Sequence, residues 1–145
     1  MYKLDKIYVY FYALNFLIFN LVALIFIRFQ NLGDIDFYLG AQTSVNWTII
    51  YKSTGLIKFI AGTINLGLGE YFTHFFFFVI ALSGFSYLLQ TAQLTKRYTI
   101  LMMLMFCMPS ISIWSSLAGK EAVAIFSSSV ILANLIRLYR RERVN

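Results

Sequence analysis

Residues 98–136 read YTILMMLMFCMPSISIWSSLAGKEAVAIFSSSVILANLI, two apolar runs separated by the adjacent charges of Lys120 and Glu121. The run before the charge pair has 22 uncharged residues, enough to cross a hydrocarbon core at about 20 residues per helix. The run after it has only 15, and it spans only if Lys120 and Arg137 extend toward opposite interfaces, as long basic side chains can. This stretch therefore predicts two membrane helices joined by a tight, charged turn.

The rest of the chain has a composition typical of membrane proteins. Of its 145 residues 60% are hydrophobic and only 12% are charged, against roughly 25% charged in soluble domains. The first apolar run is longer than the roughly 7–15 residues of a signal-peptide core, so we interpret it as an uncleaved anchor. The sequence predicts an all-α integral membrane protein, one domain over residues 1–145, with four transmembrane helices at about 7–28, 71–93, 98–118 and 121–137.

Four spans place both termini on one side of the membrane, and the charges then divide unevenly. The terminal side carries eight basic and two acidic residues: Lys3, Lys6, Lys96, Arg97, Arg137, Arg140, Arg141 and Arg143 against Asp5 and Glu142. The opposite side carries four of each: Arg28, Lys52, Lys58 and Lys120 against Asp34, Asp36, Glu70 and Glu121. Because Lys and Arg concentrate in cytoplasmic segments, we expect a multi-pass protein of the inner (plasma) membrane with both termini cytoplasmic.

The basic tail, residues 138–145, is interpreted as a cytoplasmic stop-transfer anchor in contact with anionic lipids, not as a nucleic-acid site. The outer loop, residues 29–70, is the only long connection. Within it TGLIKFIAGTINLGLGE (54–70) places Leu56, Ile57, Ile60 and Ile64 at helical spacing. The segment is too short and too rich in glycine to span, which favours an interfacial or re-entrant helix.

Pro109 interrupts the third apolar run. It cannot donate a hydrogen bond to the carbonyl of Met105, so we expect the helix to bend within a turn of that residue. Four serines follow and offer hydroxyls to backbone groups that lack partners near the bend: Ser110, Ser112, Ser115 and Ser116. The pattern predicts a kinked, serine-lined outer end, a candidate cavity wall.

Two aspartates open the outer loop in NLGDIDFYLGAQ (31–42). Asp34 after Gly33 fits a helix N-cap and Asp36 fits a first helical turn. Alternatively, either carboxylate is held just outside the membrane as a general base, or as a ligand for a divalent metal ion bound to phosphate. Both alternatives remain open on the residues alone.

Further polar candidates lie at the outer ends of the spans. Lys120 and Glu121 do not face each other on a helix, so they mark either an interfacial turn or a site for an anionic, lipid-linked group. His74 follows Glu70 by four residues on one helical face, and it is either an interfacial or capping residue or part of the site. The asparagines Asn15, Asn20 and Asn134 are interpreted as helix-to-helix contacts.

The uncleaved first span, the loop opening GDIDFY and the later MPSISIWSSLAGKEA resemble the amino-terminal part of bacterial multi-spanning C-type glycosyltransferases, a group that includes exopolysaccharide and O-antigen polymerases. The resemblance implies a polyprenyl-phosphate-linked sugar as substrate and a catalytic acidic residue in the first outer loop, Asp34 or Asp36. It matches the second motif to Pro109, Trp114, Ser115, Lys120 and Glu121. The predicted substrate-binding residues are Lys120, Glu121, Trp114, Arg28 and His74.

Enzymes of this group usually have many more than four spans. The resemblance therefore implies a fragment or a split subunit that needs further membrane helices from another chain. The alternative is a non-catalytic small membrane subunit that packs on a larger membrane complex. A channel or transporter is disfavoured because no span carries a charge in the middle of the membrane.

Overall fold

The computed structural model describes residues 6–29, 39 and 53–140, and within these ranges every element is an α-helix. This confirms the all-α prediction. By length and composition α1, α5 and α8 could each cross a membrane, and the bent pair α6–α7 makes a fourth span if it counts as one. The helices are α1 (Lys6–Phe29), α4 (Ser53–Leu68), α5 (Glu70–Ala92), α6 (Lys96–Phe106), α7 (Pro109–Ser116) and α8 (Lys120–Tyr139).

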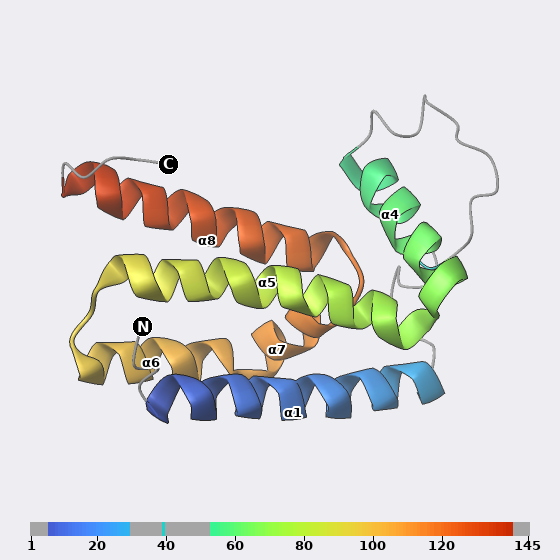
Figure 1. The fold of residues 1–145 in the computed structure, drawn as a ribbon, viewed down its shortest axis with the longest axis horizontal. Coiled ribbons are helices and arrows are strands. Elements are labelled where there is room, and N and C mark those ends of the chain that lie inside the picture. The colour runs from blue at the N-terminus through green and yellow to red at the C-terminus, as the bar shows by residue number, and fades with distance from the viewer. Residues whose placement is uncertain (1–5, 30–38, 40–52, 141–145) are drawn as a thin grey trace.

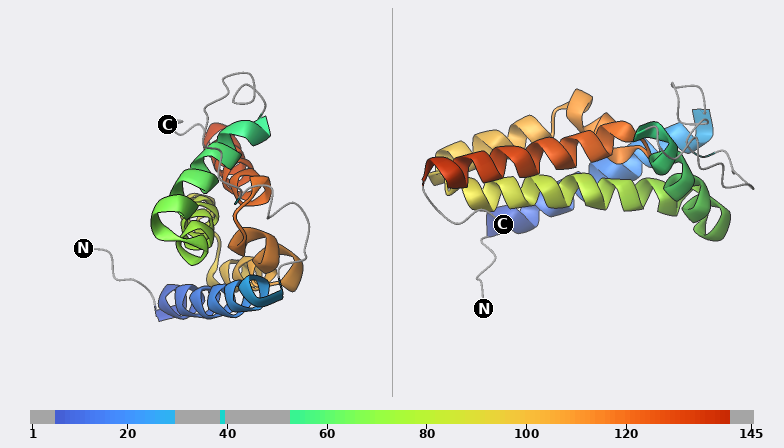
Figure 2. Two further views of the ribbon diagram at one scale, coloured as in Figure 1. Left: turned by 90° about the vertical axis from the view of Figure 1, so that its right-hand side faces the viewer. Right: turned by 90° about the horizontal axis from the view of Figure 1, so that it is seen from above.

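The long helices lie lengthwise in one bundle (Figures 1 and 2). The start of α1 and the end of α8 lie at the same end, on the left of Figure 1, which we call the terminal end. Helix α4 lies at the opposite end, which we call the loop end. This arrangement agrees with the expectation that the first span begins and the last span ends on the same side.

Helix α5 is the centre of the bundle, and it runs parallel to α8 and packs against it (Figure 1). At the terminal end the Arg140 guanidinium donates to the carbonyls of Thr91 (3.0 Å) and Ala92 (2.7 Å), which caps the last turn of α5. In the middle, a Cβ built on Gly84 would lie 2.7 Å from the Cα of Phe126. Because Gly84 has no side chain, the two backbones approach closely, as small residues allow in membrane helices.

Aromatic rings and two hydrogen bonds hold α1 against α5. The rings of Phe19 and Phe78 stack with centroids 4.7 Å apart. The Tyr71 hydroxyl donates to the Asn20 side-chain oxygen at 2.8 Å, and a second such bond joins Tyr12 to α5. Asn20 is therefore a helix-to-helix contact, as its place in the first apolar run predicted.

The third span is broken rather than bent. Helix α6 ends at Phe106 and α7 starts at Pro109, and their axes differ by 64°. Proline occupies the first turn of the new helix, where a missing N–H costs nothing. The predicted interruption within a turn of Met105 is confirmed, and it takes the form of a break between two helices. Met108, the residue before Pro109, has an extended backbone because proline disfavours the helical conformation in the residue before it.

Two serines after the break donate hydrogen bonds to backbone carbonyls near it. The Ser112 hydroxyl donates to the carbonyl of Phe106, the last residue of α6, at 3.2 Å. The Ser115 hydroxyl donates to the Ser112 carbonyl at 3.1 Å. Both side chains are buried, as is Ser116, whereas Ser110 is exposed. The predicted use of the hydroxyls is confirmed for Ser112 and Ser115. The cavity wall stays a prediction.

Helix α4 confirms the expected helix in the outer loop. It is only 16 residues long and packs on the start of α5 at the loop end (Figure 1). Its Ala61 is fully buried in a cluster with Phe77, Ala81 and Ala118, so α4 also covers the turn before α8. Gly69 joins α4 to α5 with φ of 85°, a left-handed conformation that favours glycine.

The two-sided arrangement predicts which positions are accessible from each side of the membrane. In a chain whose Cys107 is replaced by serine, Leu66→Cys in α4 should react with an impermeant thiol reagent added outside the cell. Thr95→Cys, in the exposed link between α5 and α6 at the terminal end, should react only after the membrane is opened. Labelling of both from the same side would contradict the four-span arrangement.

Candidate functional site

His74 organises the loop end of the bundle from the second turn of α5. Its side chain is completely buried, and its Nδ1 accepts a hydrogen bond of 2.9 Å from the backbone N–H of Ala118. Because Nδ1 is the acceptor, the neutral imidazole carries its proton on Nε2. Nε2 lies 3.6 Å from Oε1 of Glu70, one helical turn earlier, which is too long for a hydrogen bond.

The carboxylate of Glu70 and the amide of Ala118 therefore lie on the two sides of one buried imidazole. The hydrogen bond from the Ala118 amide to Nδ1 fixes the tautomer of the histidine. Nε2 has no hydrogen-bond partner in the described part of the chain. His74 thus joins α5 to the segment that follows the broken span, 44 residues later in the sequence.

The segment held by His74 is the buried connection Leu117–Gly119 between α7 and α8. Leu117 and Gly119 have extended backbone conformations, and all three residues are buried. Helix α8 then starts at Lys120, and its N-cap residue, Gly119, has no side chain to cap the first turn. The start of a 20-residue helix with free amide groups is favourable for negative charge.

The predicted site residues fall into three groups. Lys120 is exposed and Glu121 is half-buried, both in the first turn of α8 at the loop end. Trp114 on α7 is 45% exposed, and His74 is the buried residue that holds the connection next to Lys120. Asp34 and Asp36 lie outside the described residues, as does the side chain of Arg28.

The structure therefore brings His74 close to the start of α8, and it does not test the proximity of the aspartates to Lys120. The spacing of Glu70 and His74 correctly placed those two side chains on one helical face. The partner of His74, the Ala118 amide, was missed because a backbone N–H carries no sequence signal. The only indication was the Gly119 turn between two apolar runs.

A metal site is not formed by the residues that the structure describes. Over 6–29, 39 and 53–140, no group of three His, Cys, Asp or Glu side chains is placed to hold an ion. The carboxylates predicted for such a role, Asp34 and Asp36, lie outside these ranges.

Comparison of the chain with protein-family models, with curated proteins and with solved structures found no match. The resemblance to multi-spanning glycosyltransferases thus stays a prediction from the two sequence motifs.

Proposed function

We propose that the loop end binds the phosphate of a polyprenyl-phosphate-linked sugar, and that the chain is a membrane glycosyltransferase or polysaccharide polymerase, or part of one. The observation that supports this proposal most is the start of α8. Its N-cap residue is a glycine without a capping side chain, Lys120 is exposed in its first turn, and a hydrogen bond from the Ala118 amide to His74 joins the preceding connection to α5.

Each of these features favours a phosphate. Unpaired amides at the start of a helix donate hydrogen bonds to anions, and a lysine adds a compact positive charge. In membrane proteins the starts of broken helices often face the anionic part of a substrate. Here α8 starts directly after the broken α6–α7 pair.

In the proposed reaction the acceptor hydroxyl attacks the anomeric carbon of the sugar. The bond from this carbon to the carrier phosphate breaks, and the phosphate leaves with the bonding electrons. A carboxylate of the outer loop, Asp34 or Asp36, takes the proton of the hydroxyl, and Lys120 with the first amides of α8 stabilises the charge on the leaving phosphate. His74 acts as a positioning residue because it is buried.

The test measures glycan product in cells that carry single substitutions. Lys120→Ala and at least one of Asp34→Asn and Asp36→Asn should lower the product by about 100-fold or more, the scale of a general base. Lys96→Ala, which removes an exposed lysine at the terminal end, is the matched control and should retain product.

The abundance of each variant in the membrane has to be measured in parallel. Normal abundance with lost product supports the proposal. Full product in a chain with all three substitutions would contradict it and would favour the non-catalytic subunit. Lost abundance would show that these charges stabilise the fold, which also contradicts a catalytic role.

A further inference from the structure

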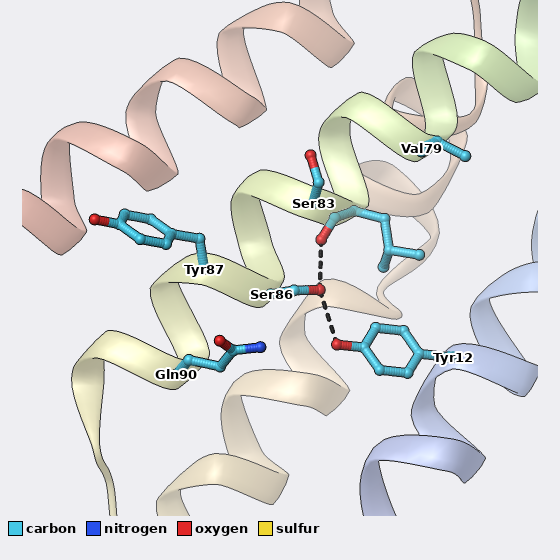
Figure 3. A pocket seen from close by; sticks show the side chains of 7 residues that line it. Tyr12, Val79, Ser83, Ser86, Tyr87 and Gln90 are labelled. Carbon is cyan, nitrogen blue, oxygen red and sulfur yellow. Dashed lines mark hydrogen bonds between the residues drawn. The ribbon is translucent and has the colours of Figure 1, made fainter. Parts of the chain in front are cut away.

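A groove runs along the membrane face of α5, away from the loop end. It has a volume of about 400 Å³ and is lined by Tyr12 of α1 and by α5 residues from Val79 to Gln90. Figure 3 shows these side chains along one face of α5, with Tyr12 reaching across from α1. The volume is within the roughly 300–1,000 Å³ of small-molecule sites.

The hydroxyls in the middle of this groove are satisfied within the protein. Tyr12 donates to Ser86 at 3.0 Å, Ser86 donates to the Leu82 carbonyl at 2.7 Å, and Ser83 donates to the Ile80 carbonyl at 2.7 Å. Their donor hydrogens are therefore not available to an occupant. A wall of this kind suits a hydrocarbon chain better than a polar molecule or a helix that would bind through hydrogen bonds.

The length of the groove matches one leaflet of a bilayer. From Val79 to Gln90 the helix rises about 16 Å at about 1.5 Å per residue. Half of a hydrocarbon core of about 30 Å is about 15 Å. Because Gln90 lies two residues before the end of α5, the groove occupies the leaflet of the terminal end.

A positive charge lies beside this end of the groove. The guanidinium of Arg137 is 5.1 Å from the centre of the Tyr87 ring, and Tyr87 lines the groove. The described residues of the terminal end include five basic ones, Lys6, Lys96, Arg97, Arg137 and Arg140, whereas the described acidic residues, Glu70 and Glu121, belong to the loop end. Of these cations, Arg137 contacts a groove residue.

The geometry points to a binding site for one anionic phospholipid, with an acyl chain along Val79–Gln90 and its phosphate beside Arg137. The positive charge of Arg137 favours an anionic head group. The length of the groove and the hydroxyls that are already hydrogen-bonded within the protein favour an acyl chain. The site is distinct from the loop end and does not depend on the function proposed there. Its occupant comes from the bilayer on the terminal side.

Native mass spectrometry of the detergent-purified chain tests this site, with phosphatidylglycerol and phosphatidylcholine of identical acyl chains as the probes. The first phosphatidylglycerol should bind more tightly than phosphatidylcholine. Arg137→Gln should weaken phosphatidylglycerol binding about fivefold, the effect of about 1 kcal/mol per basic residue at an anionic surface. Arg137→Lys should keep most of the affinity.

Two further variants distinguish the contribution of the Arg137 charge to lipid binding from the contribution of the groove. Arg97→Gln removes an exposed charge from the same end without touching the groove, so it should leave the affinity within twofold. Ser83→Phe, at an exposed groove position, should weaken both lipids because the new ring occupies the space of the chain. Equal losses in Arg97→Gln and Arg137→Gln, or no preference for phosphatidylglycerol, would overturn the proposal.

A photo-reactive amino acid at Val79, which is 44% exposed, identifies the occupant in intact membranes. Covalent addition of a phospholipid mass supports the lipid site. Cross-linking to a second copy of the chain or to another membrane protein would overturn it and would make the groove a helix-docking surface.

Discussion

Gly84→Ala should lower the free energy of unfolding by about 1–3 kcal/mol, the range for overpacking a close contact. The added Cβ would lie 2.7 Å from the Cα and 3.0 Å from the carbonyl oxygen of Phe126. Because both are backbone atoms, no rotation of a side chain relieves the contact, and α8 has to move away from α5. Gly84→Val should have a larger effect for the same reason.

Reversible unfolding in mixed micelles, followed by circular dichroism, measures this loss. Ser83→Ala is the matched control because Ser83 is exposed, and it should change the free energy by no more than about 0.5 kcal/mol. Phe126→Ala should not restore the stability of Gly84→Ala, since it removes the ring but leaves the backbone of α8 in place. A Gly84→Ala chain as stable as the original would contradict the close approach of the two helices.

His74→Leu should destabilise the protein and release the connection before α8. Leucine fills a similar volume but accepts no hydrogen bond, so the buried Ala118 N–H loses its partner. Leaving such a group unsatisfied costs about 1–3 kcal/mol. The loss should be local, because His74 contacts the Leu117–Gly119 connection from α5.

Hydrogen–deuterium exchange provides the local measurement. Amides of residues 117–121 should exchange faster in His74→Leu, while those in the middle of α5 and α8 keep their protection. Phe76→Leu, an exposed position on the same helix, is the control and should leave all segments unchanged. Unaltered exchange at 117–121 would show that the imidazole does not hold the connection.

Hydropathy alone located the long apolar helices well. The runs predicted at 7–28, 71–93 and 121–137 correspond to α1, α5 and α8, and the segment within the outer loop corresponds to α4. Long uncharged runs are reliable because every backbone group in a hydrocarbon core needs an internal partner, which a helix supplies. The short last run extends to 20 residues in α8 because the helix also includes Lys120 and Glu121 before it and Arg137–Tyr139 after it, and long basic side chains can reach an interface.

The shape of the third predicted span did not follow from nearby residues alone. Pro109 determined that the helix is interrupted near Met105, because proline lacks the required N–H. Whether the interruption becomes a kink or two separate helices depends on what satisfies the freed groups. Here the Ser112 hydroxyl bonds to the Phe106 carbonyl, and a full break at 64° results.

The sequence by itself thus determined the long apolar helices, the interruption at Pro109, and the helical face shared by Glu70 and His74. These features follow from interactions within a few residues of each other. Only the tertiary structure decided that α5 packs against α8, that Gly84 meets Phe126, and that His74 binds the Ala118 amide. These pairs are about 40 residues apart in the chain. They form because small residues let two helices pack closely and because a buried amide requires an acceptor.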